Sequence, residues 1–289
     1  MDTTEILKKV RKIEIKTKGL SKHIFSGEYH SAFKGRGMSF SEVREYQYGD
    51  DVRNIDWNVT AKTGDAHVKV FEEERELTVM LIVDVSRSGL FGTNTQFKSE
   101  MILEIAAVIA FSATTNNDKV GAILFSDKIE KYIPPKKGRT NILRIIRELI
   151  YLENKGTGTD LNQALEYFNN VQKKRSIAFV LSDFMTDNYS NALTIASRRH
   201  DVVGLHIFDE REQELPNVGL IKVQDAESGI TRVVDTSIAK IRETYAENYT
   251  KRIAMVKEAF NRNGSDILSI GTHQDYVKSL LQFFKKRSR

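Results

Sequence analysis

The sequence predicts an α/β fold with a doubly wound, mostly parallel sheet. From residue 77 onward, short apolar runs alternate with segments of helical periodicity, the pattern of a parallel sheet covered by helices on both faces. Two of the runs, LTVMLIV at 77–83 and SIAFVL at 176–181, are apolar almost throughout, as strands buried on both faces are. A chain of 289 residues, 40% hydrophobic and 29% charged, is large enough to bury such a core.

The expected elements follow one another with short connections. Strand 129–133 alternates like an exposed edge strand, which Pro134 and Pro135 are expected to end. Helices are expected at about 99–115, 140–152, 160–171, 191–199, 237–262 and 274–284. Strands are expected at 77–83, 120–125, 129–133, 176–181, 202–208, 220–224, 231–234 and 266–270.

Two regions are expected, an N-terminal extension of residues 1–76 and an α/β domain of residues 77–289. The extension is rich in glycine, acids and aromatic residues and carries few core residues. We therefore expect it to pack on the α/β domain, where a strand at 67–71 could join the sheet. Within the domain, the two strands joined around Ser228-Gly229 predict a hairpin inserted at about 217–235.

A motif of charged and aromatic residues lies in the extension. Trp57, the only tryptophan, is interpreted as a buried anchor that holds the extension to the core. Ion pairs around it could fix the extension in place, and direct contact with a partner is the alternative. The structural role is preferred, because buried ion pairs more often specify geometry than bind. The motif consists of Arg44, Tyr46, Asp50, Asp51, Arg53, Asp56 and Trp57.

Composition narrows the class of protein. Cysteine is absent, which removes disulfides, thiolate metal sites and cysteine nucleophiles. The first residues, MDTTEILKKVRK, lack the apolar core of a signal peptide. The longest apolar runs, 79–83 and 105–111, fall far short of the roughly 18 residues that cross a bilayer. These features predict a cytoplasmic protein with no membrane span.

Positive charge gathers near both ends of the chain, whose net charge is +5. The clusters at 8–12 and 285–289 could contact nucleic acid or an acidic membrane surface. The preferred interpretation is a solvated helix face or a frayed tail. No aromatic residue interleaves with the C-terminal cluster to stack on bases, so no nucleic-acid partner is expected.

Oxygen-bearing side chains stand where two predicted strands end. Asp84 follows the first buried strand and precedes Ser86 and Ser88, while Asp183 follows the strand at 176–181. Thr159 comes after the glycine turn GTGT, at the start of a helix. In a doubly wound sheet, ligands bind beyond the carboxyl ends of the strands.

The chemistry of this set favours a hard divalent cation. Carboxylate and hydroxyl oxygens suit Mg²⁺, Mn²⁺ or Ca²⁺ better than zinc or copper. Two acids and three hydroxyls leave coordination positions open, which would attract an acidic side chain from a partner. The alternative is that the same residues only cap helices and turns: Asp84, Ser86 and Thr159 are all suited to holding backbone amides.

The spacing resembles the metal-ion-dependent adhesion site (MIDAS) of von Willebrand factor type A domains. That site has Asp-x-Ser-x-Ser at a strand end, a threonine after a glycine turn and an aspartate at the end of a later strand. The resemblance implies a magnesium or manganese ion whose shell a partner's Glu or Asp completes. Gly89 departs from the pattern, since a larger apolar residue is common there. The implied ligands are Asp84, Ser86, Ser88, Thr159 and Asp183.

The N-terminal motif resembles the domain-of-unknown-function 58 family. The residues concerned read GEYHS at 27–31, GRG at 35–37 and GDD-x-R-x-IDW at 49–57. Members are bacterial and archaeal, and many are encoded beside MoxR-type AAA+ ATPases. The resemblance implies an adaptor in ATPase-driven protein remodelling, complex assembly or metal insertion, with a MoxR-type ATPase as partner.

Enzymatic alternatives lack their characteristic residues. Ser86 stands where a phosphohydrolase with an aspartyl nucleophile carries its second acid. There is no Walker-type loop and no Gly-x-Ser-x-Gly elbow. His206 lies mid-strand and is expected to be a packed core residue. We therefore expect a non-enzymatic, metal-dependent protein-binding adaptor with no small-molecule substrate; a basic nucleic-acid-binding protein and a metal-dependent phosphohydrolase are the alternatives.

Overall fold

The computed structural model describes residues 8, 11–14, 38–73, 77–90, 97–152, 158–224 and 230–287. Contacts divide the chain into two units. We call Phe33–Leu77 the small unit, and Met1–Ala32 together with Thr78–Arg289 the large unit. The expected packing of residues 1–76 on the α/β domain stays a prediction.

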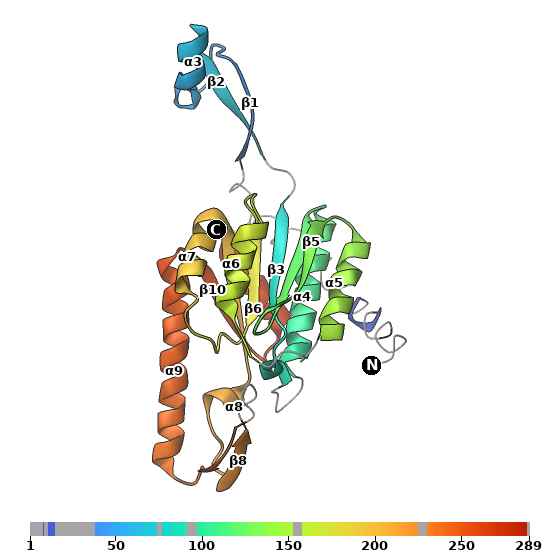
Figure 1. The fold of residues 1–289 in the computed structure, drawn as a ribbon, viewed down its shortest axis with the longest axis vertical. Helices are drawn as coiled ribbons and strands as arrows, with labels where there is room; N and C mark the ends of the chain where they lie inside the picture. The colour runs from blue at the N-terminus through green and yellow to red at the C-terminus, as the bar shows by residue number, and fades with distance from the viewer. Residues whose placement is uncertain are drawn as a thin grey trace. The chain divides into compact units, whose positions relative to one another are not determined.

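The large unit is built on a six-stranded sheet of order β10-β7-β6-β3-β4-β5 (Figure 1). Neighbouring strands are parallel except for β4 and β5, which are antiparallel. The chain adds β4 and β5 on one side of β3 and then β6, β7 and β10 on the other, which confirms the doubly wound, mostly parallel sheet. The strands are β3 (Thr78–Asp84), β4 (Lys119–Phe125), β5 (Ile129–Lys136), β6 (Ile177–Ser182), β7 (Asp201–Phe208) and β10 (Asp266–Gly271).

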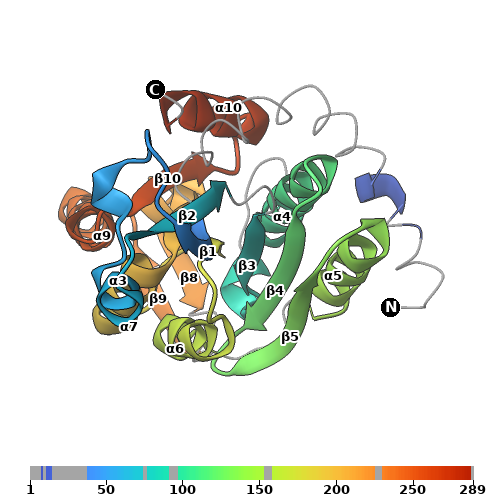
Figure 2. The same ribbon diagram turned by 90° about the horizontal axis from the view of Figure 1, so that it is seen from above.

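Helices cover both faces of this sheet (Figure 2). On one face lie α4 (Lys98–Thr115), α5 (Arg139–Leu152) and α10 (Tyr276–Arg287). On the other lie α6 (Leu161–Val171), α7 (Ser190–Arg199) and α9 (Ala239–Arg262). Because α4 contacts β3, β4, β6 and β7, most of its residues are buried. None of the helices within the described ranges combines the length and the apolar character needed to cross a membrane.

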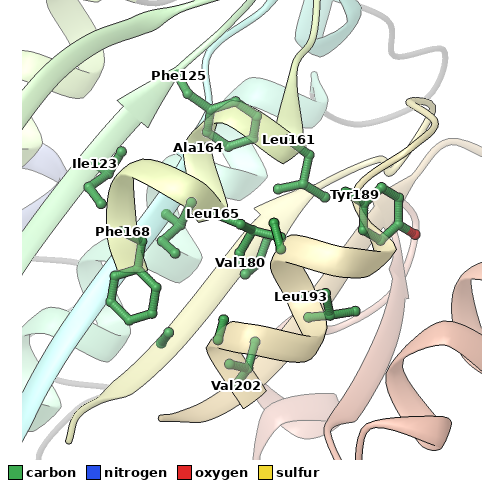
Figure 3. Packing of buried hydrophobic residues seen from close by; sticks show 14 of the residues in the cluster. Ile123, Phe125, Leu161, Ala164, Leu165, Phe168, Val180, Tyr189, Leu193 and Val202 are labelled. Atoms are coloured by element: carbon green, nitrogen blue, oxygen red, sulfur yellow. The ribbon is translucent and has the colours of Figure 1, made fainter. Parts of the chain in front are cut away.

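Alternation along the strands sends side chains to both faces. Val180 of β6 enters a hydrophobic cluster with Phe168 of α6 and Leu193 of α7 (Figure 3). The preceding residue, Phe179, points the other way and packs edge to face on Phe284 of α10, with ring centroids 6.3 Å apart. Burial on both faces explains why β3 is apolar from Val79 to Val83 and β6 from Ile177 to Leu181.

The edge strand β5 runs on through Pro134 and Pro135, so the expectation that these prolines end it is wrong. On an edge strand, a residue without an N–H group need not break a hydrogen bond on the open side. The pairing with β4 shifts between Val120 and Ala122. Gly121 lies at this shift, and a Cβ there would stand 2.8 Å from the Pro135 nitrogen, so the glycine allows the two strands to approach.

The expected hairpin forms from β8 (Leu220–Gln224) and β9 (Thr231–Asp235), which pair antiparallel. Its predicted joint at Ser228-Gly229 lies outside the described residues, as does most of the glycine turn before Thr159. A short helix that the sequence analysis missed, α8 (Glu210–Gln213), precedes the hairpin. Together α8 and the hairpin form an insert between the end of β7 and the start of α9.

One residue of the basic end of α10, Arg287, is held by ion pairs, while Lys285 and Lys286 are exposed. The side chain of Arg287 is only 7% exposed and pairs with Asp201 and Asp266, the second at 3.2 Å. Two carboxylates compensate the buried guanidinium, so the expectation of a solvated or frayed end is wrong for this residue.

The small unit is a two-stranded sheet with short helical segments. Strands β1 (Met38–Glu45) and β2 (His67–Glu73) pair antiparallel, and η1 (Val52–Asn54) and α3 (Trp57–Thr63) come between them in the sequence. Strand β2 confirms the strand expected at 67–71. It pairs with β1 and not with the six-stranded sheet, which corrects the expectation that it could join that sheet.

The charged residues of the motif form local pairs inside the small unit. Arg44 donates two hydrogen bonds to the Asp50 carboxylate, at 2.8 and 2.7 Å. Arg53 lies 3.3 Å from Asp51, and Asp56 accepts hydrogen bonds from two backbone amides in the first turn of α3. These contacts brace the turns of the unit itself.

Trp57 is not buried, which corrects its interpretation as an anchor. It is the first residue of α3, and 70% of its surface is exposed. Among the residues of this unit whose burial is described, the buried apolar one is Val68 of β2, at 2% exposure. Tyr46 is half-buried, and its backbone amide donates a hydrogen bond to Ala66. A two-stranded unit offers too little apolar surface to cover an indole ring as well.

This exposure makes a prediction for Trp57. The Trp57→Ala variant should keep its free energy of unfolding within about 0.5 kcal/mol of wild type, because exposed side chains contribute little. Circular dichroism in urea measures this. In the wild-type protein, fluorescence should show a water-exposed indole that acrylamide quenches readily. A loss of more than about 2 kcal/mol would restore the anchoring role.

Candidate metal centre

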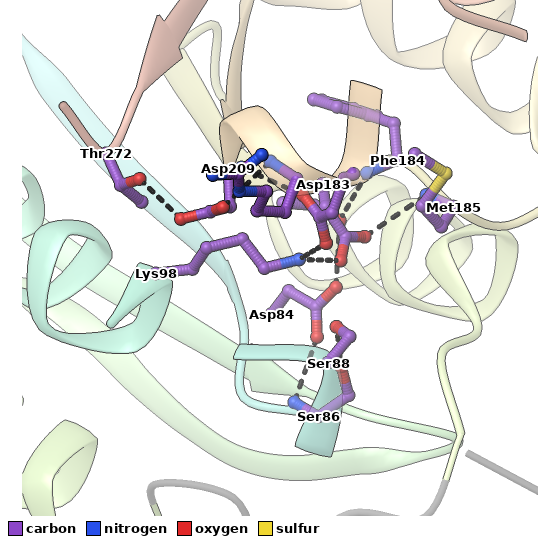
Figure 4. A network of polar contacts seen from close by, with 12 residues as sticks. Asp84, Ser86, Ser88, Lys98, Asp183, Phe184, Met185, Asp209 and Thr272 are labelled. Carbon is purple, nitrogen blue, oxygen red and sulfur yellow. Dashed lines mark hydrogen bonds and ion pairs between the residues drawn. The ribbon is translucent and has the colours of Figure 1, made fainter. Parts of the chain in front are cut away.

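The site begins where β3 and β6 end side by side. These parallel strands pair from Val79 to Val83, so their carboxyl ends meet where the winding of the sheet changes direction. Asp84, at the end of β3, is 8% exposed. Its carboxylate accepts a hydrogen bond from the Ser86 amide at 2.9 Å and another from the Ser182 hydroxyl at 2.8 Å (Figure 4).

Two hydroxyl groups stand next to this carboxylate. Ser86 and Ser88 bring their Oγ atoms within 2.9 Å of each other. Ser88 lies in η2 (Arg87–Leu90), a single turn that follows the end of β3. Neighbouring ligands of an octahedral Mg²⁺, each 2.0–2.1 Å from the ion, lie about 3 Å apart. The two hydroxyls form a hydrogen bond with each other, at a separation that neighbouring ligands would also have.

Asp183 comes from the adjacent strand end. It is 4% exposed, and its Oδ1 accepts a hydrogen bond from the Met185 amide at 3.1 Å. The next residue, Phe184, is fully buried with a left-handed backbone (φ 55°), and its amide donates to the Ser182 hydroxyl at 3.0 Å. Ser182 thus links the two loops, since it donates to Asp84 and accepts from the loop that carries Asp183.

Thr159 lies at the same edge of the sheet. Its carbonyl accepts a hydrogen bond from the Thr186 hydroxyl at 3.0 Å, which places its backbone beside the loop after β6. The amide of Asp160 donates to Ser126, just after β4, at 2.7 Å. Hydrogen bonds and burial bring Asp84, Ser86, Ser88 and Asp183 together, whereas Thr159 is placed here by its backbone.

A lysine that the sequence analysis missed completes the cluster. Lys98, the first residue of α4, is 1% exposed. Its ammonium donates to Asp183 Oδ2 at 2.8 Å and to Glu212 Oε1 at 2.5 Å. Glu212 belongs to α8, where it forms a capping box with Asp209. The sequence contains one signal for this contact. A positive charge in the first turn of a helix is unfavourable, because the N-terminus of the helix dipole is itself positive, so a lysine there indicates carboxylates nearby.

Burial and charge set the ionisation of these groups. Burial, and then the negative charge of Asp183, raises the pKa of Asp84 to about 6. Burial would also raise the pKa of Asp183, but the charge of Lys98 and its hydrogen bond outweigh this and lower it. Burial would lower the pKa of Lys98, yet the two carboxylates raise it. Asp84 is therefore the carboxylate whose charge is poorly compensated.

The residues present fit a hard divalent cation. Within the described ranges, Asp84 has no ion pair with a basic side chain, so a cation would compensate a charge that burial makes costly. No cluster of three or more His, Asp or Glu side chains suited to a metal occurs in the described part of the chain, so hydroxyls would supply the remaining ligands. Binding of a metal by Asp84, Ser86, Ser88, Thr159 and Asp183 stays a prediction.

His206 is a core residue, as expected. It is 1% exposed in β7, and its ring stacks on Phe208 with centroids 5.3 Å apart. Its Nδ1 lies 3.1 Å from the Ser269 hydroxyl. Burial lowers the pKa of its imidazole to about 4, so the ring is neutral at physiological pH.

Solved structures with a similar arrangement are distant in sequence. An aerotolerance-related membrane protein from Bacteroides fragilis has a TM-score of 0.48 at 16% identity and covers 73% of this chain and 98% of its own. A von Willebrand factor type A structure from Catenulispora acidiphila has a TM-score of 0.43 at 12% identity, covering 76% and 43%. The SpRpn10 VWA domain has a TM-score of 0.38 at 13% identity, covering 72% and 94%.

Sequence relatives are closer. "Uncharacterized protein Rv1480" of Mycobacterium tuberculosis and "Uncharacterized protein Mb1516" of Mycobacterium bovis are each 30% identical over 292 residues, covering 100% of this chain and 92% of theirs. The family model described as "Protein of unknown function DUF58" matches residues 42–254, which include the small unit's motif and the whole candidate site. The chain therefore belongs to the DUF58 family.

Proposed function

We propose that this protein is a non-enzymatic, metal-dependent adaptor that binds a partner protein in the cytoplasm. The observation that carries the proposal is the buried Asp84 carboxylate beside the paired hydroxyls of Ser86 and Ser88, at the edge where the sheet changes direction. Mg²⁺ is the proposed ion, with Mn²⁺ and Ca²⁺ as alternatives. A bound ion would supply an open coordination position for an acidic side chain of the partner.

Different side chains would bind the ion, compensate its charge and position its ligands. The Ser86 and Ser88 hydroxyls, with that of Thr159, would hold the ion, and the two carboxylates would compensate its charge. Ser182 keeps the Asp84 carboxylate in place by its hydrogen bond at 2.8 Å. Since hydroxyls are neutral, an ion held mainly by them keeps a strong attraction for a further anion.

Two exposed apolar side chains stand on the insert among polar neighbours, and they are suited to contact with a protein partner. In the hairpin register Lys222 pairs with Val233, so Leu220 and Val233 share one face of the ribbon. These two side chains are 73% and 69% exposed. The insert follows the carboxyl end of β7, the edge of the sheet that also carries the candidate site. A protein partner that docks at this edge would cover these two side chains.

We propose a MoxR-type AAA+ ATPase as the partner, because the N-terminal motif resembles that of a family whose members are often encoded beside such ATPases. The role would be in protein remodelling, complex assembly or metal insertion. The alternatives lack support of this kind: Ser86 stands where a phosphohydrolase would need an acid, and Arg287 in the basic C-terminal cluster is paired with aspartates.

A capture experiment tests the proposal. The immobilised protein should retain a MoxR-type AAA+ ATPase from the same organism in Mg²⁺ and lose it in EDTA. The Asp84→Ala variant should fail to retain it, whereas Asp187→Ala should behave as wild type. Asp187 is a matched control, because it lies in the loop after β6 but is 76% exposed. Retention that ignores both EDTA and Asp84→Ala would contradict metal-dependent binding.

A further inference from the structure

The candidate site includes a positively charged side chain of the protein itself, the ammonium group of Lys98. It contacts Asp183, one of the proposed metal ligands, at 2.8 Å, and it is 1% exposed (Figure 4). Lysine is among the residues least often buried, because removing its charge from water is costly. Its position beside a metal ligand suggests a role in binding.

The charges around Lys98 can be counted from its contacts. The ammonium bridges Asp183 and Glu212, and Asp84 lies next to Asp183 without an ion pair of its own among the described residues. With all four groups ionised, three negative charges and one positive charge leave the cluster at −2. Replacing Lys98 by a neutral residue would take it to −3, and replacing Glu212 would take it to −1.

Glu212 is the second carboxylate that fixes the ammonium. Its Oε2 accepts a hydrogen bond from the Asp209 amide at 2.9 Å, and Asp209 in turn accepts from the Thr272 hydroxyl at 2.8 Å. These bonds hold α8 at the end of β7 and the start of the loop after β10. The ammonium therefore has a fixed position, from which its charge acts on whatever occupies the site.

We propose that Lys98 sets the metal affinity of the site, by repelling a divalent ion and by neutralising Asp183, and that Glu212 opposes this effect by drawing on the same ammonium. This inference rests on the proposed function, because it concerns the same site. The wild-type protein would then bind its ion weakly and reversibly, with the ion retained best when a partner's carboxylate adds its own negative charge. Because the groups are buried, added salt would screen the effect only slightly.

Titration calorimetry with Mn²⁺ tests the proposal on the full chain. Lys98→Gln should bind Mn²⁺ at least about tenfold more tightly than wild type, and Glu212→Gln several-fold more weakly, since each changes the local charge by one unit. The double variant restores the count of −2 and should return to within about threefold of wild type. Lys128→Gln, a 66% exposed lysine just after β4 at the same edge, is the control and should not change the affinity.

Each outcome decides a separate point. If wild type binds Mn²⁺ and Lys98→Gln binds equally or more weakly, Lys98 does not set the affinity, while the proposed function stands. If neither wild type nor any variant binds Mn²⁺, both proposals fail. Should Lys98→Gln not fold, as its circular dichroism would show, Glu212→Gln keeps the ammonium and tests the same charge effect. Unchanged affinity in Glu212→Gln would then overturn the proposal.

Discussion

Asp84→Asn is expected to stabilise the metal-free protein at pH 8 and to abolish its binding of divalent ions. Burial raises the pKa of Asp84 from its ordinary 3.8 to about 6, so ionising it at pH 8 costs the folded state up to about 3 kcal/mol. Asparagine removes the charge and can still accept the hydrogen bond from Ser86. It loses one acceptor for Ser182, so we expect a net gain of about 1–2 kcal/mol.

The gain should depend on pH. Between pH 3.8 and about 6 the folded protein takes up a proton on Asp84 that the unfolded chain does not hold as readily. Stability therefore falls as pH rises through this window, and the penalty is complete above it. At pH 4 this penalty is almost gone while the lost acceptor for Ser182 remains, so Asp84→Asn should there be about 1 kcal/mol less stable than wild type. Urea unfolding in EDTA at pH 8 and pH 4 measures both values.

Asp187→Asn is the control. Asp187 is exposed in the loop after β6, so this change should alter neither stability nor metal binding by a measurable amount. If Asp84→Asn destabilises the metal-free protein at pH 8 as much as at pH 4, the carboxylate is needed for the fold as a hydrogen-bond acceptor. The helix-cap interpretation would then replace the metal site.

Phe260→Ala should cost about 3–5 kcal/mol of unfolding free energy, the largest effect we expect from a single core substitution. Phe260 of α9 is fully buried and packs edge to face on Phe184, with centroids 5.4 Å apart. It also fills the space above Gly204, where a Cβ would lie 2.8 Å from its ring. Its removal leaves a cavity next to the loop that carries Asp183.

Met255→Ala is the matched control on the same helix. Met255 is 63% exposed, so its loss should change stability by less than about 0.5 kcal/mol. Urea unfolding of both variants, followed by circular dichroism, gives the comparison. A cost below about 1 kcal/mol for Phe260→Ala would mean that α9 is not held by this contact.

Strong local patterns made most of the large unit predictable. The central residues of strands β3 and β6 are all apolar because both faces are covered, and this signal needs no knowledge of the partner strands. Placing Asp84 and Asp183 at the same edge followed from the rule that parallel strands end together. The prolines of β5 led to a wrong end for this strand, because a sequence does not show which strand lies at an open edge. The strand can continue through them because Gly121 of β4 lies opposite.

Long-range contacts explain what was missed. Lys98 and Glu212 are 114 positions apart, and only the folded sheet brings them together. Trp57 was interpreted as buried because large aromatic residues usually are, but burial depends on how much apolar surface the neighbouring elements provide. Strand β1 was missed because MSFSEVRE carries too few apolar residues in alternation to indicate a strand without its partner β2.

Anomalous diffraction from crystals grown in Mn²⁺ tests the central claim most directly. The account predicts one strong peak at the edge where β3 and β6 end, within bonding distance of the Ser86 and Ser88 hydroxyls, with Lys98 still on Asp183. A saturating concentration of Mn²⁺ that leaves this position without a peak would contradict it. The residues expected around the peak are Asp84, Ser86, Ser88, Thr159 and Asp183.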